Sequence, residues 1–326
     1  MNAQGWLPAF VQWRDGAPRV QWVLLREERL LEPFYNDTMR RVMRHPFHRL
    51  FRQETTMEEM VEWTEANPGL EPRGFLFHMS RCGSTLLAQM LAASDKNVVA
   101  SEPPPLDSVL QAPLHLPELQ REVHLTWIRA MVRALAQPRG GNETAFYLKL
   151  DCWHTHSIAL LRDAFPQVPW IFLYRDPVEV LASHHQIPAM WTIPSMMDPR
   201  ALHLQLGDWE PAQHDLYRAR ALANICAAGC KAAKDGSGLL VNYTELPHAM
   251  EHRLIQHLQI DPKDLPPMLE RSRKSAKSPG THFTSDTAQK QAEATEATRA
   301  AAARYLSPIY TELESVRLEQ LAGVSR

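Results

Sequence analysis

Apolar and polar positions along the chain form two kinds of segment. Short continuous apolar runs bounded by polar or Gly/Pro-containing turns are typical of strands buried on both faces of a parallel sheet. Longer stretches with apolar residues at helical spacing separate these runs, and this alternation predicts an α/β fold with a central parallel sheet and helices on both faces. The predicted strands are 75–77, 97–100, 145–150, the first part of 169–177, and 239–246. The predicted helices begin near Ser84 and cover 117–137, 156–165, 212–235 and 288–322, the last with a break at Pro308.

The first 70 residues follow a different pattern. Residues 6–25 alternate apolar and polar side chains around an Asp-Gly turn, which predicts a β-hairpin. Residues 26–66 are richer in Arg, Glu and Met and are predicted to be helical. We therefore expect an N-terminal hairpin and helical extension (1–70) and one main domain (71–326).

The turn after the first strand of the main domain has the composition of an anion-binding loop. Gly83 allows close approach of the backbone, and a helix is predicted to begin directly after it. Successive backbone N–H groups and the positive end of a helix dipole favour a phosphate at such a position. Arg81 can supply a cation, and the hydroxyls of Ser84 and Thr85 can donate further hydrogen bonds.

This loop differs from the Walker A loop of nucleoside triphosphatases. The Walker motif has a lysine between its last glycine and the Ser/Thr pair, whereas here Gly83 is followed directly by Ser84. A nucleoside triphosphate bound with magnesium needs positive charge at that missing position. A donor that transfers one sulfuryl group carries less charge there and needs no metal.

Charged side chains follow three other predicted strands. Glu102 precedes a run of three prolines, and Lys149 ends its strand. Arg175 also ends a strand, and Ser183 follows eight residues later on the next helix. Ligands of open parallel sheets bind at the carboxyl ends of the strands, so we expect these groups near the loop. An Arg at a strand end and a Ser on the next helix can jointly hold a second phosphate.

Two segments resemble sulfotransferases that use 3′-phosphoadenosine 5′-phosphosulfate (PAPS). SRCGSTL, 80–86, is similar to their 5′-phosphosulfate loop, with Cys82 where Ser is usual and Ser84 where Thr is usual. WIFLYRDPVEVLASHH, 170–185, resembles the segment that holds the 3′-phosphate. The resemblance covers about Phe75 to Leu246 and implies a three-layer P-loop-like fold.

The resemblance also implies a role for each matching residue. Arg81, Cys82, Gly83, Ser84 and Thr85 would hold the 5′-phosphosulfate through their backbone and side chains. Arg175 and Ser183 would hold the 3′-phosphate. Lys149 would stabilise the bridging oxygen as it leaves, and Glu102 would accept the proton of the acceptor, with loop-to-Glu spacing similar to that of tyrosylprotein sulfotransferases. No metal takes part.

Some roles stay open on the sequence alone. In cytosolic relatives a His two residues beyond the lysine is the base, and Asp151 stands there, so this residue is the alternative to Glu102. His154 and His156 are candidate acceptor contacts; a His-x-His pair without further ligands at a familiar spacing does not predict a metal site. Arg273, Lys274 and Lys277 belong to a basic run that resembles the family's 3′-phosphate-closing segment.

Composition limits the possible partners. The 326 residues carry a formal net charge of −2, which does not favour nucleic acid. No apolar stretch is long enough for a transmembrane helix, and no signal peptide is visible, so we expect a cytoplasmic protein without a membrane span. The four cysteines show no disulfide or CxxC pattern and are expected to be reduced.

The expected activity is transfer of a sulfuryl group from PAPS to a hydroxyl or amine of a small molecule, glycan or peptide. Two alternatives remain. An ATP-dependent phosphotransferase would require magnesium, and a non-catalytic nucleotide-binding protein of the same fold would bind adenosine 3′,5′-bisphosphate without transferring any group.

Overall fold

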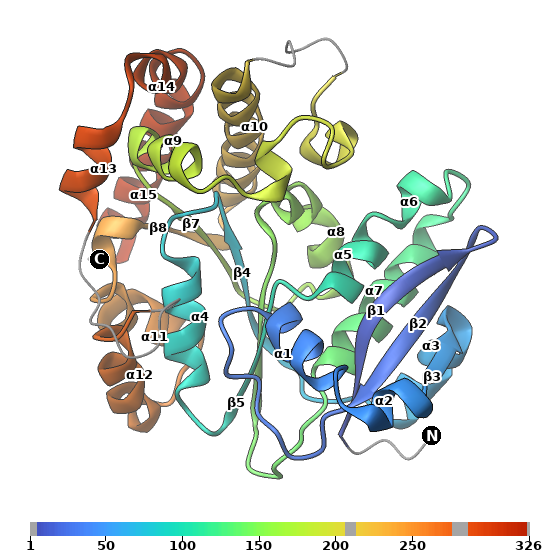
Figure 1. Ribbon diagram of the computed structural model, residues 1–326. Helices are drawn as coiled ribbons and strands as arrows, with labels where there is room; N and C mark the ends of the chain where they lie inside the picture. The colour runs from blue at the N-terminus through green and yellow to red at the C-terminus, as the bar shows by residue number, and fades with distance from the viewer. Residues whose placement is uncertain (1–4, 206–212, 276–285, 325–326) are drawn as a thin grey trace.

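The computed structural model describes residues 5–205, 213–275 and 286–324. Its centre is a five-stranded sheet in which every neighbouring pair is parallel, in the order β5-β6-β4-β7-β8 (Figure 1). The strands are β4 (Pro72–His78), β5 (Asn97–Ser101), β6 (Ala145–Lys149), β7 (Trp170–Tyr174) and β8 (Gly238–Asn242). The predicted α/β class with a parallel sheet is therefore confirmed, and all five predicted strands exist.

Helices cover both faces of this sheet. Figure 1 shows α4 (Ser84–Ala92), α11 (Ile255–His257) and α12 (Leu265–Ser272) on one side and α7 (Arg121–Leu135) and α8 (Ile158–Ala164) on the other. Every residue of α4 is buried, in accord with its mostly apolar sequence. The remaining helices of the main domain are α5 (Pro104–Leu110), α6 (Ala112–His115), α9 (Pro177–Gln186) and α10 (His214–Lys234).

Two glycines allow these layers to pack closely. A Cβ atom on Gly229 of α10 would lie 2.8 Å from the Phe172 ring of β7. A Cβ atom on Gly74 of β4 would lie 2.6 Å from the Leu258 side chain. Real Cβ contacts are longer, so these positions need glycine for the helix layers to reach the sheet.

The N-terminal extension forms a second, antiparallel sheet. β1 (Trp6–Arg14) and β2 (Ala17–Leu24) make the predicted hairpin, and β3 (Gln53–Thr56) adds to β2. The prediction of a helical 26–66 was only partly right. Three helices occur there, α1 (Tyr35–Val42), α2 (Pro46–Leu50) and α3 (Met57–Ala66), but 26–34 is irregular and β3 interrupts the series.

The C-terminal tail is divided more than its sequence predicts. It contains α13 (Thr287–Glu293), α14 (Glu296–Ala301) and α15 (Ser307–Val324). At the break expected at Pro308 the helix does not end: a π-helical segment, Ala302–Leu306, joins α14 to α15, and Pro308 lies in the first turn of α15. No helix among the described residues is both long enough and apolar enough to cross a membrane.

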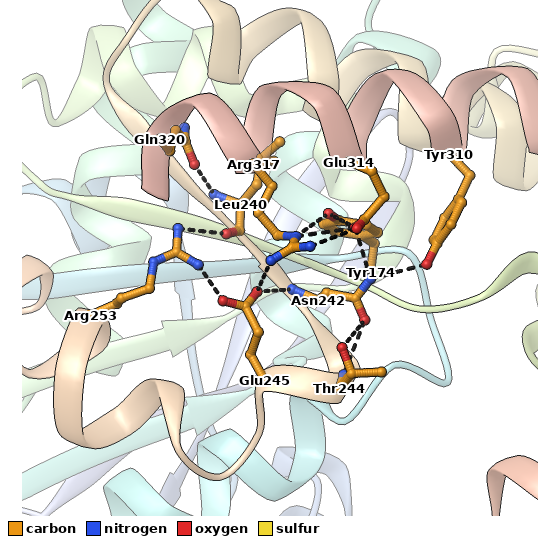
Figure 2. A network of polar contacts seen from close by, with 10 residues as sticks. All are labelled: Tyr174, Leu240, Asn242, Thr244, Glu245, Arg253, Tyr310, Glu314, Arg317 and Gln320. Atoms are coloured by element: carbon orange, nitrogen blue, oxygen red, sulfur yellow. Dashed lines mark hydrogen bonds and ion pairs between the residues drawn. The ribbon is translucent and has the colours of Figure 1, made fainter. Parts of the chain in front are cut away.

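A polar network fixes α15 to the strands β7 and β8 (Figure 2). The Glu314 carboxylate accepts hydrogen bonds from Tyr174, from Asn242 Nδ2 at 2.8 Å and from Arg317 Nη2 at 2.6 Å. Glu245 pairs with Arg317 at 3.5 Å and also with Arg253 of the chain that follows β8. This network gives Glu245, just after β8, a structural role.

Arg317→Ala is expected to lower the free energy of unfolding by about 2 kcal/mol, because it leaves the mostly buried Glu314 carboxylate without its cation, while Glu245 keeps Arg253. Urea denaturation followed by circular dichroism measures this. A loss below about 0.5 kcal/mol, the usual result for a surface substitution, would contradict the assigned role.

Candidate functional site

The loop between β4 and α4 has a backbone shape that few residues adopt. Ser80 and Arg81 have φ angles of +78° and +51°, and Gly83 has +87°. Left-handed conformations cost energy in residues with a Cβ and concentrate at functional sites. Gly83 is the N-cap of α4, no side chain caps that helix, and a Cβ there would lie 2.9 Å from the Leu246 side chain. The first N–H groups of α4 have no partner within the helix and form a cradle for an anion.

Two side chains of this loop, those of Arg81 and Cys82, lie in different surroundings. Arg81 lines a cavity, donates from Nη2 to the Ile187 carbonyl at 2.8 Å, and forms no ion pair with a carboxylate of the described chain. Cys82 is buried, its Sγ donates to the Leu173 carbonyl at 3.2 Å, and burial raises the pKa of its thiol to about 11. Cys82 therefore offers only its backbone to a ligand, and its replacement of the usual Ser leaves the cradle intact.

The cavity beside this loop has a volume of about 380 Å³ and two unlike walls. Polar groups from the ends of β4, β5 and β6 form one wall, and apolar side chains from three separate segments form the other. The polar wall consists of His78, Ser80, Arg81, Ser84, Thr85, Glu102 and Asp151, and the apolar wall of Phe34, Cys152, Trp153, Ala189, Met190 and Trp191.

Glu102 is one of the polar residues that line this cavity. Its φ of +53° turns the side chain out of the β5 direction, and its N–H donates to the Lys149 carbonyl at 2.7 Å. Its carboxylate forms an ion pair with Lys149 and lies 3.3 Å from His78 Nε2. Burial alone would raise the pKa of this carboxyl, but the Lys149 ammonium and His78 lower it below the ordinary value. Glu102 is therefore ionised at neutral pH.

His78 is a site residue that the sequence did not reveal. Its Nδ1 accepts the Ser80 N–H at 3.0 Å, so the ring proton is on Nε2, which lies 2.9 Å from the Leu150 carbonyl. Burial lowers the pKa of this imidazole, which keeps it neutral. Its only signal in the sequence is a histidine at the end of an otherwise apolar strand.

Lys149 occupies a different position from the one predicted. Its side chain is fully buried, does not line the cavity, and has its ammonium 5.3 Å from the centre of the Phe34 ring. Glu102 lies between Lys149 and the cavity. Lys149 is therefore linked to the cavity by its ion pair with Glu102, which lines it.

Asp151, the alternative base, lines the same cavity in a different electrostatic environment. Burial and the neighbouring carboxylates of Glu102 and Asp107 raise the pKa of Asp151 well above the ordinary value. Asp107, also absent from the sequence-based prediction, accepts hydrogen bonds from Trp153 Nε1 and His154 Nε2, both at 2.7 Å. The pKa values of the two carboxyls of the cavity are thus shifted in opposite directions, that of Glu102 down and that of Asp151 up, an arrangement that can divide base from acid roles.

The two histidines of the His-x-His pair are occupied by protein contacts. His154 Nδ1 accepts the Asp151 N–H at 3.2 Å, and its Nε2 contacts Asp107, so both ring nitrogens are used. His156 stacks on His203 with ring centres 3.8 Å apart. Neither ring lines the cavity. Asp107, Asp151 and His154 are close enough to share a cation, but a metal would have to displace these hydrogen bonds.

Arg175 lies beside the loop, at the end of the neighbouring strand β7. Its Nη1 is 3.4 Å from the Arg81 carbonyl, so the two predicted anion-binding segments are in contact. The guanidinium also lies over the Tyr243 ring, 4.1 Å from its centre. Its Nε contacts Glu179 and its Nη2 contacts Asp286, each at 2.6 Å.

Arg175 and Ser183, which were predicted to hold one phosphate together, are not bonded to each other in the described chain. Ser183 is half-buried on α9, four residues after Glu179 and therefore on the same face of the helix. Helix α13 lies along this face, where Thr287 donates to Glu179 at 3.1 Å. Within the described ranges no hydrogen bond joins Ser183 to Arg175.

The predicted basic segment is only partly described. Lys277 lies outside the described residues. Arg273 and Lys274 are exposed and do not line the cavity, and Lys274 lies 3.8 Å from Glu270.

No protein-family model and no curated protein matches this chain. Solved structures with a similar fold include sulfotransferase STF9 from Mycobacterium avium, with a TM-score of 0.49 and 12% identity over 78% of this chain and 80% of that chain. A sulfotransferase from Alicyclobacillus acidocaldarius has a TM-score of 0.41 and 14% identity over 76% and 96% of the two chains. The sulfotransferase domain of the Synechococcus PCC 7002 olefin synthase has a TM-score of 0.38 and 16% identity over 78% and 95%. Likeness at this level concerns the fold, and function has to be derived from this chain's own side chains.

Proposed function

We propose that the protein is a sulfotransferase that moves a sulfuryl group from PAPS to a hydroxyl or amine acceptor. The observation that carries the proposal is the contact between two anion-binding segments at adjacent strand ends, with Arg175 Nη1 3.4 Å from the Arg81 carbonyl. An ionised carboxylate, Glu102, lines the cavity beside them. Two cradles and a base at one sheet edge suit a donor with two phosphate-bearing ends.

The cradle at the start of α4 fits the 5′-phosphosulfate. No side chain caps its N–H groups, and Ser84, Thr85 and Arg81, whose guanidinium has no carboxylate partner in the described chain, line the cavity. No lysine stands at the position that a magnesium-bound triphosphate requires, which disfavours the phosphotransferase alternative.

The second anion-binding segment, with Arg175 and Ser183, can hold the 3′-phosphate if the ion pair of Arg175 with Asp286 opens. Arg175 is already neutralised by Glu179 and Asp286, and the Asp286 side chain is 41% exposed. A phosphate that binds the Nη2 side of Arg175 must displace this carboxylate. Ser183, on the face of α9 that α13 covers, becomes available to the phosphate in the same rearrangement.

Transfer would proceed by direct displacement at sulfur. The acceptor oxygen or nitrogen forms a bond to sulfur while the bond from sulfur to the bridging phosphate oxygen breaks, and Glu102 accepts the acceptor's proton. Protonation removes the negative charge that holds Lys149. The Lys149 ammonium can then stabilise the charge that develops on the departing phosphate, which reconciles its burial with the predicted role.

The apolar wall constrains the acceptor. Phe34, Trp153, Met190 and Trp191 line the same cavity of about 380 Å³ as the polar groups. We propose that the acceptor presents a hydroxyl or amine on an apolar or aromatic body, since a sugar would leave its other hydroxyls against these side chains without partners.

The direct test is transfer of radiolabelled sulfate from PAPS into a metabolite extract in the presence of a chelator. The proposal predicts labelled product with the wild-type protein and little with Glu102→Gln. Nucleotide binding without any labelled product would favour the non-catalytic alternative, and transfer from labelled ATP that stops on chelation would favour the phosphotransferase.

Asp286→Asn is expected to tighten the binding of adenosine 3′,5′-bisphosphate about two- to fivefold, the scale of one partly exposed ion pair. The substitution removes the carboxylate that competes with the 3′-phosphate for Arg175. Calorimetric titration measures the affinity, with Asp261→Asn as the control, since Asp261 pairs with the distant Lys96. Weaker binding in Asp286→Asn would show that Asp286 supports the site.

A further inference from the structure

The end of α2 exposes two adjacent apolar side chains that the proposed function does not use. Leu50 is 77% exposed and Phe51 is 59% exposed. They lie in the segment 44–52, here called the α2 tip, which Figure 1 shows at the edge of the molecule next to the N-terminal sheet. The cavity of the proposed active site includes no residue of this tip. Two neighbouring large apolar side chains this exposed indicate a contact surface.

The tip and the end of α1 before it are also strongly basic. Five arginines and no acidic residue lie between positions 40 and 52, three of them within the tip, in a chain whose net charge is −2. Among the described residues, only Arg41 of the five is ion-paired, with Glu28 and Glu32. The nearby Glu54 pairs with Arg14. The exposed arginines without a carboxylate partner in the described chain are Arg40, Arg44, Arg49 and Arg52.

The order of these residues favours a lipid surface over other anionic partners. Leu50 and Phe51 stand directly between Arg49 and Arg52, so apolar groups and cations point from the same short segment. Nucleic acid offers phosphates but no apolar layer for an exposed leucine. The boundary between lipid headgroups and acyl chains offers both.

We propose that the α2 tip docks this protein on the surface of an anionic lipid bilayer. Leu50 and Phe51 enter the boundary between headgroups and acyl chains, and Arg44, Arg49 and Arg52 contact lipid phosphates. This contact requires no membrane-spanning segment, in accord with the absence of such a helix in the described chain. The proposal is independent of the sulfotransferase reaction.

Sedimentation of the full-length protein with vesicles tests the proposal. Vesicles of one part phosphatidylserine to two parts phosphatidylcholine are expected to bind the protein, and vesicles of phosphatidylcholine alone are not. Arg49→Gln with Arg52→Gln is expected to weaken binding about 25-fold, at about fivefold for each arginine. Leu50→Ser with Phe51→Ser is expected to weaken it at least tenfold.

Two double variants serve as matched controls and should bind like the wild type. Lys231→Gln with Lys263→Gln removes the same charge from exposed positions elsewhere, and Val123→Ser with Leu318→Ser removes exposed apolar groups that are 43% and 56% accessible. Equal loss in tip and control variants would overturn the proposal. So would binding to anionic vesicles and to RNA that is unaffected by Leu50→Ser with Phe51→Ser.

A second measurement detects insertion directly. All four native cysteines are buried, so Phe51→Cys supplies a selectively accessible thiol for an environment-sensitive fluorophore. Anionic vesicles are expected to shift the emission to shorter wavelength, as for a probe that leaves water. An unshifted emission on vesicles that sediment the labelled protein would contradict docking through the tip.

Discussion

Glu102→Gln is expected to lower kcat by about 10²- to 10⁴-fold, the range typical of a lost general base. The affinity for adenosine 3′,5′-bisphosphate should change little, because in the proposed complex Glu102 contacts the acceptor and the two anion-binding segments contain other residues. Steady-state kinetics with labelled PAPS and calorimetry of the nucleotide measure the two quantities separately.

The same variant must be checked for folding, because Glu102 neutralises the fully buried Lys149. The glutamine oxygen can still accept a hydrogen bond from the ammonium, so a thermal unfolding transition should remain. Unchanged kcat in a folded Glu102→Gln variant would assign the base to Asp151 or a histidine.

The pH profile separates these candidates further. The pKa of Glu102 is lowered, so its ionised fraction is constant above about pH 5 and gives no acid limb near neutrality. The pKa of Asp151 is raised, so a rate that depends on ionised Asp151 would increase with pH through the raised value.

Arg175→Ala is expected to weaken adenosine 3′,5′-bisphosphate binding by about 1.5–3 kcal/mol, roughly 10- to 150-fold, the scale of a lost charge-assisted hydrogen bond. Arg175 supplies the only guanidinium in the described chain that contacts both the loop carbonyl at Arg81 and the face of α9. Calorimetric titration of the nucleotide without metal measures the loss.

Arg317→Ala is the matched control for this change. Arg317 also contacts two carboxylates and a tyrosine, but it belongs to the α15 network and contacts no residue that lines the cavity (Figure 2). It should lose stability and retain nucleotide affinity. If both variants lost affinity equally, the effect of Arg175→Ala would be structural.

The sequence allowed the central sheet to be predicted because buried strands are short continuous apolar runs between turns. The turn between β4 and α4 was predictable for a related reason: it depends mainly on local residues and on Gly83, which precedes α4, whereas its role in anion binding stays a prediction. β3 was missed because its four residues are polar and exposed to half-buried, and only the pairing with β2 makes them a strand.

The partners of the site residues could not be predicted in the same way. Lys149 ends its strand as expected, but its burial depends on Phe34, more than a hundred residues earlier in the chain. Likewise, the ion pair from Arg175 to Asp286 joins residues 111 positions apart. Local patterns carry no information on such contacts, and His78 and Asp107 became visible as site residues only through them.

Calorimetric titration of the wild-type protein with adenosine 3′,5′-bisphosphate, in chelator and without metal, tests the central claim most directly. Two neighbouring anion cradles predict saturable binding at micromolar concentrations, weakened by Arg175→Ala and by Arg81→Ala. Absence of binding in chelator, together with tight binding of magnesium-ATP, would contradict the account.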